Sequence, residues 1–155
     1  MPANNIAAWN GSSWSALSSG MAEGLGNLGV YALTVYKDTL YAGGRFTIAG
    51  GDSINHIARW NGSAWSPLGS GMSAAVVALT VFDDKLIAGG EFITAGGVGA
   101  NHVAAWDGSA WSALGSGTNS IVFDLSVFRD KLIAGGMFTA AGEVDASYIA
   151  EWSLK

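Results

Sequence analysis

A repeat of 46 residues is the feature that most constrains how this chain can fold. Three series of residues recur at this interval: Trp60, Trp106 and Trp152; Gly43, Gly89 and Gly135; and Phe46, Phe92 and Phe138. Residues 55–100 and 101–146 are identical at 29 of 46 aligned positions, so we expect the two segments to share a backbone and a burial pattern. A fixed period of this length is typical of repeat architectures, in which each repeat is one small structural unit.

Each repeat reads as four β-strands. In the best-defined repeat, the apolar runs 76–82 and 85–92 are joined by Asp83 and Asp84, which predicts a short hairpin. The runs 101–106 and 109–114 are joined by Asp107 and Gly108, a pair that tolerates the positive φ of a type I′ turn. No segment has a sustained helical period, so we predict an all-β protein with 13 strands.

Two further features of the repeat indicate its family. A double glycine closes the second strand, and two spaced tryptophans follow on the third and fourth strands, as in Trp60 and Trp65. This pattern resembles the kelch-type β-propeller repeat, and more closely the IAxWNGSxW...LxAGGxFTxAGG repeats of large bacterial surface and secreted proteins. The resemblance implies a β-propeller of four-stranded antiparallel blades, with about three blades in this chain. The expected divisions are a partial blade at 5–17, blades at 30–69 and 76–115, and an incomplete blade at 121–152.

Three four-stranded repeats in 155 residues are also compatible with a β-trefoil or a β-prism, two folds that often bind sugars. The strand at which the repeat begins and the strand at which it ends argue against both folds. The chain begins with a third strand (5–9) and a fourth strand (13–17), and it ends on another third strand (148–152).

An open stack of three blades would leave an apolar face bare at each end, so we expect the ring to be completed by homo-oligomerisation. Two chains would give six blades and three chains would give nine, and we favour the dimer. Residues 13–17 of a partner would supply the missing fourth strand of the last blade. The third strand would then be present twice, and the sequence does not decide which copy is displaced.

The composition narrows the possible partners. The net charge of −5, from 7 Lys and Arg against 12 Asp and Glu, argues against nucleic acid. We expect no membrane span and no secretory signal, because the chain has neither a long apolar run nor a charged start followed by an apolar segment. Cysteine is absent, which leaves the compartment undetermined.

An insertion of five residues distinguishes the first repeat, because Trp9 and Trp60 are 51 residues apart. It falls within residues 22–29, where GLGNLG matches the G-x-G-x-x-G pattern of dinucleotide-binding turns. A strand-like segment follows where that motif requires a helix, so we predict a loop on one rim and no nucleotide cofactor. Asn27 in this loop is a candidate ligand contact.

Four other residues are candidate ligand contacts. His56, His102 and Tyr148 share one repeat position, and Asp124 stands where the other first strands have alanine. For the two histidines we favour a structural role at strand entry, and for Asp124 we favour a carboxylate that simply faces water in the central channel. We expect no metal site, because we expect equivalent positions on neighbouring blades to be too far apart for the imidazoles to converge with carboxylates. No catalytic motif is present, so we expect a non-enzymatic binding or structural scaffold. A carbohydrate-binding lectin is the alternative, and a glycan or protein on a rim is a possible partner.

Overall fold

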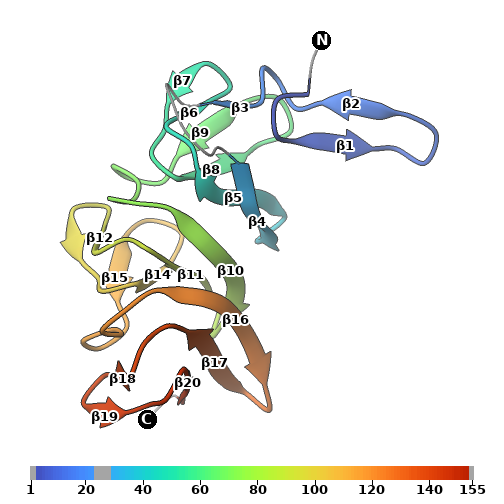
Figure 1. The fold of residues 1–155 in the computed structure, drawn as a ribbon. Coiled ribbons are helices and arrows are strands. Elements are labelled where there is room, and N and C mark those ends of the chain that lie inside the picture. Colours follow the sequence, from blue (N-terminus) through green and yellow to red (C-terminus); the bar gives the residue numbers. More distant parts are fainter. Residues whose placement is uncertain (1–2, 23–28, 154–155) are drawn as a thin grey trace.

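The computed structural model describes residues 3–22 and 29–153, which form strands, turns and loops without a helix (Figure 1). The prediction of an all-β protein is confirmed. The described residues include 13 longer strands, as expected: β1 (Ala7–Trp9), β2 (Trp14–Ala16), β4 (Gly29–Tyr36), β5 (Thr39–Arg45), β8 (Ile57–Trp60), β9 (Trp65–Pro67), β10 (Val76–Phe82), β11 (Lys85–Gly90), β14 (Val103–Trp106), β15 (Trp111–Ala113), β16 (Val122–Phe128), β17 (Lys131–Gly136) and β20 (Ile149–Trp152).

Seven two-residue strands were not predicted. They are β3 (Met21–Ala22), β6 (Ile48–Ala49), β7 (Asp52–Ser53), β12 (Thr94–Ala95), β13 (Val98–Gly99), β18 (Ala140–Ala141) and β19 (Val144–Asp145). Six of them form antiparallel pairs, β6-β7, β12-β13 and β18-β19, in the connection between the second and third longer strands of each repeat. The seventh, β3, lies between β2 and β4 in the chain and pairs with β6. Their segments have too few residues to show an alternating apolar pattern.

The longer strands form antiparallel sheets in which neighbours in the chain are neighbours in space. The first repeat unit is the sheet β4-β5-β8-β9, the second is β10-β11-β14-β15, and the third is β16-β17-β20. Before them comes an isolated hairpin, β1-β2, which matches the third and fourth strands of a unit. The third unit therefore ends at its third strand.

The hairpin that opens each unit has two adjacent residues with positive φ, as a type I′ turn requires. Asp83 and Asp84 both have φ of 51°, and the equivalent pairs in the other units behave alike. The expectation of a type I′ turn at Asp107 and Gly108 was wrong, because only Gly108 has a positive φ. There the Asp107 carboxylate accepts hydrogen bonds from the Ala110 and Ser109 backbone N–H groups, which lower its pKa to about 2.

The sheets stack face to face along the chain, with the β1-β2 hairpin at one end and β20 at the other (Figure 1). Each junction has its own apolar cluster. The hairpin and the first unit share a cluster that includes Leu17 and Phe46. The first and second units share one that includes Tyr36 and Phe92, and the second and third share one that includes Phe82.

The double glycine that closes each second strand allows this close stacking. A Cβ at Gly43 would lie 2.5 Å from Cγ1 of Val76 in the next unit, and a Cβ at Gly89 would lie 2.7 Å from Cγ1 of Val122. Real Cβ contacts are not this short, so only glycine fits there. A Cβ at the following glycine, Gly90, would lie 2.2 Å from the Ala75 carbonyl oxygen.

The described residues form neither a closed barrel nor a closed ring, and the sheets remain an open stack. A β-trefoil requires a barrel, so this alternative gains no support. No helix in the described part of the chain is long and apolar enough to cross a membrane.

Candidate functional site: the two end faces of the stack

The predicted ligand contacts His56, His102 and Tyr148 occupy a backbone position with a structural role. Their φ values are 64°, 64° and 70°, in the left-handed region that most residues avoid. The His102 N–H donates to the Phe92 carbonyl, and the His102 carbonyl accepts from the Gly90 N–H. The same two hydrogen bonds recur at His56 and Tyr148. This position turns the chain into the third strand.

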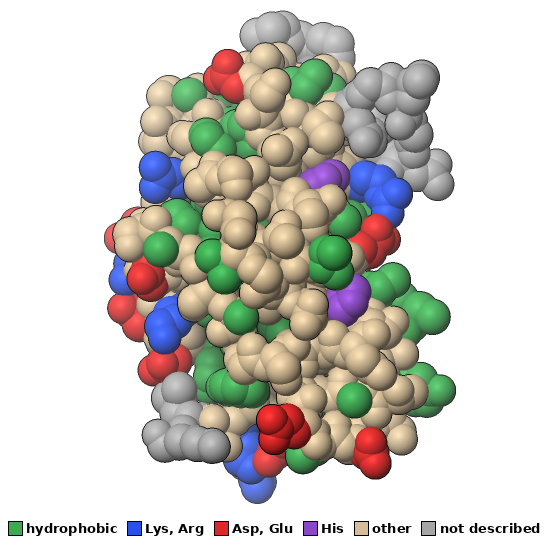
Figure 2. Space-filling view, turned by 90° about the vertical axis from the view of Figure 1, so that its left-hand side faces the viewer, with side chains coloured by type: hydrophobic (Ala, Val, Ile, Leu, Met, Phe, Trp, Pro, Cys, Tyr) green, Lys and Arg blue, Asp and Glu red, His purple; other side chains and the backbone are tan. Residues whose placement is uncertain are grey.

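The side chains at this position do not converge on one site. Nδ1 of His102 lies 3.2 Å from the carbonyl oxygen of Gly90, within its own unit. Figure 2 shows the two histidines at separate places along one face of the stack. Among the residues that the structure describes, no group of three or more His, Asp or Glu is placed to hold a metal ion.

The other two predicted contacts are Asn27 and Asp124. Asn27 falls outside the described residues. Asp124 is exposed on β16 and pairs with Gly135 of β17. The equivalent residue of the second unit, Ala78, is 6% exposed and belongs to the cluster at the next junction. Asp124 therefore stands on the face of the third unit that would pack against a further unit.

The exposure of each tryptophan side chain depends on its position in the stack. Trp65 and Trp111, on the fourth strands of complete units, are 4% and 6% exposed, whereas Trp14 on β2 is 69% exposed. On the third strands, Trp106 is 5% exposed and Trp152 is 40% exposed. The sequence predicted packing roles for all of them. Inside this chain, Trp65, Trp106 and Trp111 are buried, Trp60 is partly buried, and the copies toward the two ends are exposed.

The end of the stack formed by the third unit exposes large apolar side chains, and we call it the C-terminal face. Phe128 is 60% exposed, whereas the equivalent residues Tyr36 and Phe82 are 3% and 8% exposed because they pack against the next unit. Ile149 is 65% exposed, whereas its equivalent Ile57 is fully buried. The C-terminal face thus has the apolar residues of an internal junction without the covering sheet.

The opposite end, formed by β4 of the first unit, we call the N-terminal face. Leu33 and Val35 are 53% and 62% exposed, on the side of β4 away from the second unit. The residue equivalent to Leu33 in the third unit, Leu125, is 7% exposed because it packs against the second unit. The N-terminal face is the counterpart of the C-terminal face, since internal junctions join one face of each kind.

Gly135 shows most directly that the C-terminal face is unfilled. A Cβ at the equivalent glycines would contact a valine and a leucine of the next unit: Val76 and Leu79 for Gly43, and Val122 and Leu125 for Gly89. A Cβ at Gly135 would have nothing closer than the Tyr148 carbonyl oxygen at 4.0 Å. The residues that correspond to the missing pair are Val30 and Leu33, on the first unit.

Ion pairs also join adjacent units. Nζ of Lys37 lies 3.0 Å from Oδ2 of Asp84, so the turns that open the first and second units are bridged. Hydrogen bonds from its side chain to Tyr36 and Asp84 raise the pKa of Lys37. Arg45 and Glu91, at one shared repeat position, are likewise paired. Equivalent positions on neighbouring units are therefore close enough for long side chains to meet.

Comparison with protein-family models found no matching family, and comparison with curated proteins found no match. The geometry of the two end faces is therefore the guide to what this chain does. Sequence reasoning had identified both faces as bare, but it had not identified which side chains lie on each. The signal was present in the repeat, because Phe128 and Ile149 have buried equivalents 46 residues earlier, at Phe82 and Val103, and Leu33 has one at Leu125 in the third unit.

Proposed function

We propose that this protein is a self-assembling, kelch-like β-propeller scaffold in which the N-terminal face of one chain packs against the C-terminal face of another. Two chains then contribute three blades each to a closed ring of six, which lies within the usual range of about four to eight blades. This scaffold has no enzymatic role.

The unfilled Gly135 carries the proposal. The chain contains two complete copies of the required junction, at Gly43 and Gly89, and in each the glycine receives a valine and a leucine from the next unit. Val30 and Leu33 of a second chain supply the same two residue types for Gly135. The side chains that would become buried include Phe128 and Leu33, whose equivalents Phe82 and Leu125 are buried at an internal junction. Full burial of such a side chain contributes about 1.5 to 3 kcal/mol.

Charge supports the same pairing of faces. Arg129 occupies the repeat position of Lys37, and Asp38 occupies the position of Asp84. When the third unit packs against the first unit of a partner, Arg129 meets the partner's Asp38 as Lys37 meets Asp84. This pair is exposed, so it favours the correct face and contributes little affinity.

Native mass spectrometry and light scattering over a range of concentrations test the proposal. We expect a mass of twice 15.8 kDa that does not increase further as the concentration rises. A mass of three times 15.8 kDa would replace the six-bladed ring with a nine-bladed one. A strict monomer at millimolar concentration would overturn the proposal, and growth without limit would indicate an open filament in place of a ring.

Asp124 provides a second test, because it is the one carboxylate at a position where the other units have Ala32 and Ala78. Closure of the ring would bury it at the new junction, and a buried charge without a partner opposes association. We expect Asp124→Ala to tighten the dimer at least about tenfold, which corresponds to about 1.4 kcal/mol. Ser126→Ala, on the same strand and face, is the control, and the dissociation constants can be measured by sedimentation. An unchanged or weaker dimer in Asp124→Ala would show that this face is not buried on assembly.

A further inference from the structure

The fourth-strand tryptophan of each complete unit occupies a repeated site. Nε1 of Trp65 donates to the Leu17 carbonyl at 3.2 Å, and Nε1 of Trp111 donates to the Leu68 carbonyl at 3.1 Å. Leu17 and Leu68 directly follow the fourth strand of the preceding hairpin or unit. The indole therefore connects its own sheet to the sheet before it.

A glycine makes room for each of these indoles. A Cβ at Gly50 would lie 3.3 Å from Cδ1 of Trp65, and a Cβ at Gly96 would lie 2.7 Å from Cδ1 of Trp111. Both glycines have positive φ, at 66° and 57°. A tryptophan site is thus defined by a glycine in its own unit and a leucine carbonyl in the preceding one.

The third unit has the same site without its tryptophan. Gly142, the equivalent glycine, has a φ of 63° and nothing within 4 Å of the position of a Cβ. The equivalent carbonyl, of Leu114, accepts a hydrogen bond from the Gly117 N–H, as Leu68 does from Gly71. A carbonyl oxygen has two lone pairs, and at Leu114 no indole donates to the second one among the described residues.

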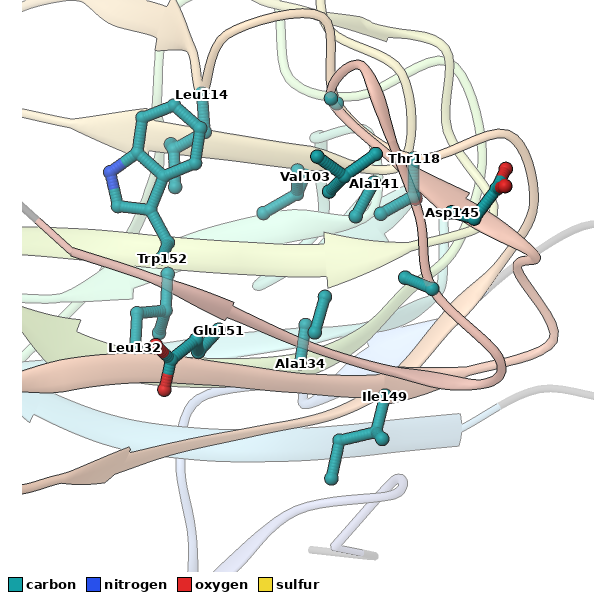
Figure 3. A pocket seen from close by; sticks show the side chains of 15 residues that line it. Val103, Leu114, Thr118, Leu132, Ala134, Ala141, Asp145, Ile149, Glu151 and Trp152 are labelled. Atoms are coloured by element: carbon teal, nitrogen blue, oxygen red, sulfur yellow. The ribbon is translucent and has the colours of Figure 1, made fainter.

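A cavity of about 270 Å³ lies at this place, between the second and third sheets (Figure 3). Gly142, Leu114 and Trp152 line it, together with apolar side chains such as Val103 and Leu132. In Figure 3 the Trp152 ring lies beside Leu114, and the ring comes within 3.0 Å of the position of a Cβ at Gly115. The third-strand indole therefore lies at the edge of the vacant site.

We propose that Trp14 of a second copy of this chain fills this cavity and donates its indole N–H to Leu114. This inference rests on the proposed ring, and it adds the residues that close it. Trp14 is the equivalent of Trp65 and Trp111, it is 69% exposed, and no acceptor for its indole N–H is found among the described residues. The site and the side chain that fits it are thus at opposite ends of one chain.

The same geometry indicates which copy of the third strand, β1 of the partner or β20, leaves the sheet when the ring closes. Trp14 belongs to a formed hairpin, in which Trp9 pairs with Trp14 and the two rings lie 5.4 Å apart. The internal hairpins have the same tryptophan pair, at 5.1 and 5.3 Å. We infer that the partner's β1-β2 hairpin enters whole, so that β1 replaces β20 beside β17.

The segment that leads into β1 fits this position better than the segment that leads into β20 does. Asn5 occupies the positive-φ position at the start of the hairpin, and asparagine tolerates that conformation better than Tyr148 does. The ion pair between Lys131 and Glu151 that holds β20 is exposed, so its loss opposes the exchange only weakly. With the partner's hairpin added, the third unit has four strands, as the other two units do.

Substitution of the tryptophan tests the inference. We expect Trp14→Ala to raise the dissociation constant of the dimer at least about 30-fold per junction, because the loss of a buried aromatic side chain at an interface has effects of this size. Trp14→Phe, which keeps a ring but loses the N–H, should fall between this variant and the unaltered chain. Tyr148→Ala is the control, since the tyrosine is lost from the sheet in the exchanged form and should not be needed. A Trp14→Ala chain that dimerises normally would overturn the inference and leave the ring itself intact.

Two cysteine pairs test the exchange separately, and the natural absence of cysteine makes them specific. The internal register pairs Ile87 with Ala105, so the exchange places Ile133 opposite Ala8 of the partner. Ala8→Cys combined with Ile133→Cys should then form a disulfide between chains, because paired strands bring Cα atoms within disulfide range.

If β20 stays and only β2 is added, the register of Ala105 with Ser112 places Glu151 opposite Ser15. Ser15→Cys combined with Glu151→Cys would then form the disulfide between chains, and that result would overturn the exchange.

Discussion

Alanine in place of Gly43 should destabilise the folded chain, while alanine in place of Gly135 should leave the dissociated chain as stable as before. The added methyl group at Gly43 would lie 2.5 Å from Cγ1 of Val76, whose branched side chain has little freedom to move. Such overpacking costs about 1 to 3 kcal/mol. At Gly135 the same methyl group has no neighbour closer than 4.0 Å. Denaturant midpoints measured below the dissociation concentration compare the two variants.

When dimerisation is measured in place of chain stability, the substitution at Gly135 should be the harmful one. In the proposed ring, Gly135 receives Val30 of a partner, so Gly135→Ala should weaken the dimer by the mechanism that destabilises Gly43→Ala within the chain. Gly142→Ala is not a suitable control, because a φ of 63° is strained for alanine. Equal losses of chain stability in the two variants, or an unaltered dimer in Gly135→Ala, would contradict the unfilled junction.

The sequence was sufficient to predict the longer strands, because each consists of an apolar run bounded by turn residues. The boundaries of β10 were predicted correctly at Val76 and Phe82. The turn at Asp107 was not, because the choice between a two-residue turn and a longer loop depends on side-chain hydrogen bonds. There the carboxylate binds two backbone N–H groups, an arrangement that a dipeptide pattern does not reveal.

The candidate site was predictable only in outline. The repeat alone implies that the outermost units lack neighbours, and from this the two bare faces followed. The sequence predicted a structural role for His56 at strand entry, but it did not reveal that this role depends on a positive φ, which is uncommon outside glycine although histidine is among the residues enriched there. The vacant tryptophan site requires the positions of Gly142 and Leu114, which lie 28 residues apart in the chain and meet only when the sheets stack.

Two variant chains, each altered on a different end face, should form a dimer when mixed although neither forms one alone. Leu33→Asp alters only the N-terminal face and Phe128→Asp alters only the C-terminal face, since these side chains are 53% and 60% exposed at the two ends. Each variant alone should be monomeric, because every junction needs one face of each kind. Burial of an unpaired carboxylate opposes the contact strongly. Both single variants should keep the chain stability of the parent, which a denaturant titration checks.

An equal mixture of the two variants should form a heterodimer of twice 15.8 kDa, held by one intact junction. The unaltered Phe128 of one chain then packs against the partner's Leu33, while the second junction carries both aspartates and stays open. Native mass spectrometry with one chain isotopically labelled would identify the mixed species. A self-complementary contact between identical faces predicts the opposite, because the variant with the unaltered face would dimerise by itself and the mixture would gain nothing. The experiment therefore separates a ring closed by two head-to-tail junctions from a dimer held by one contact between identical faces, without a new structure.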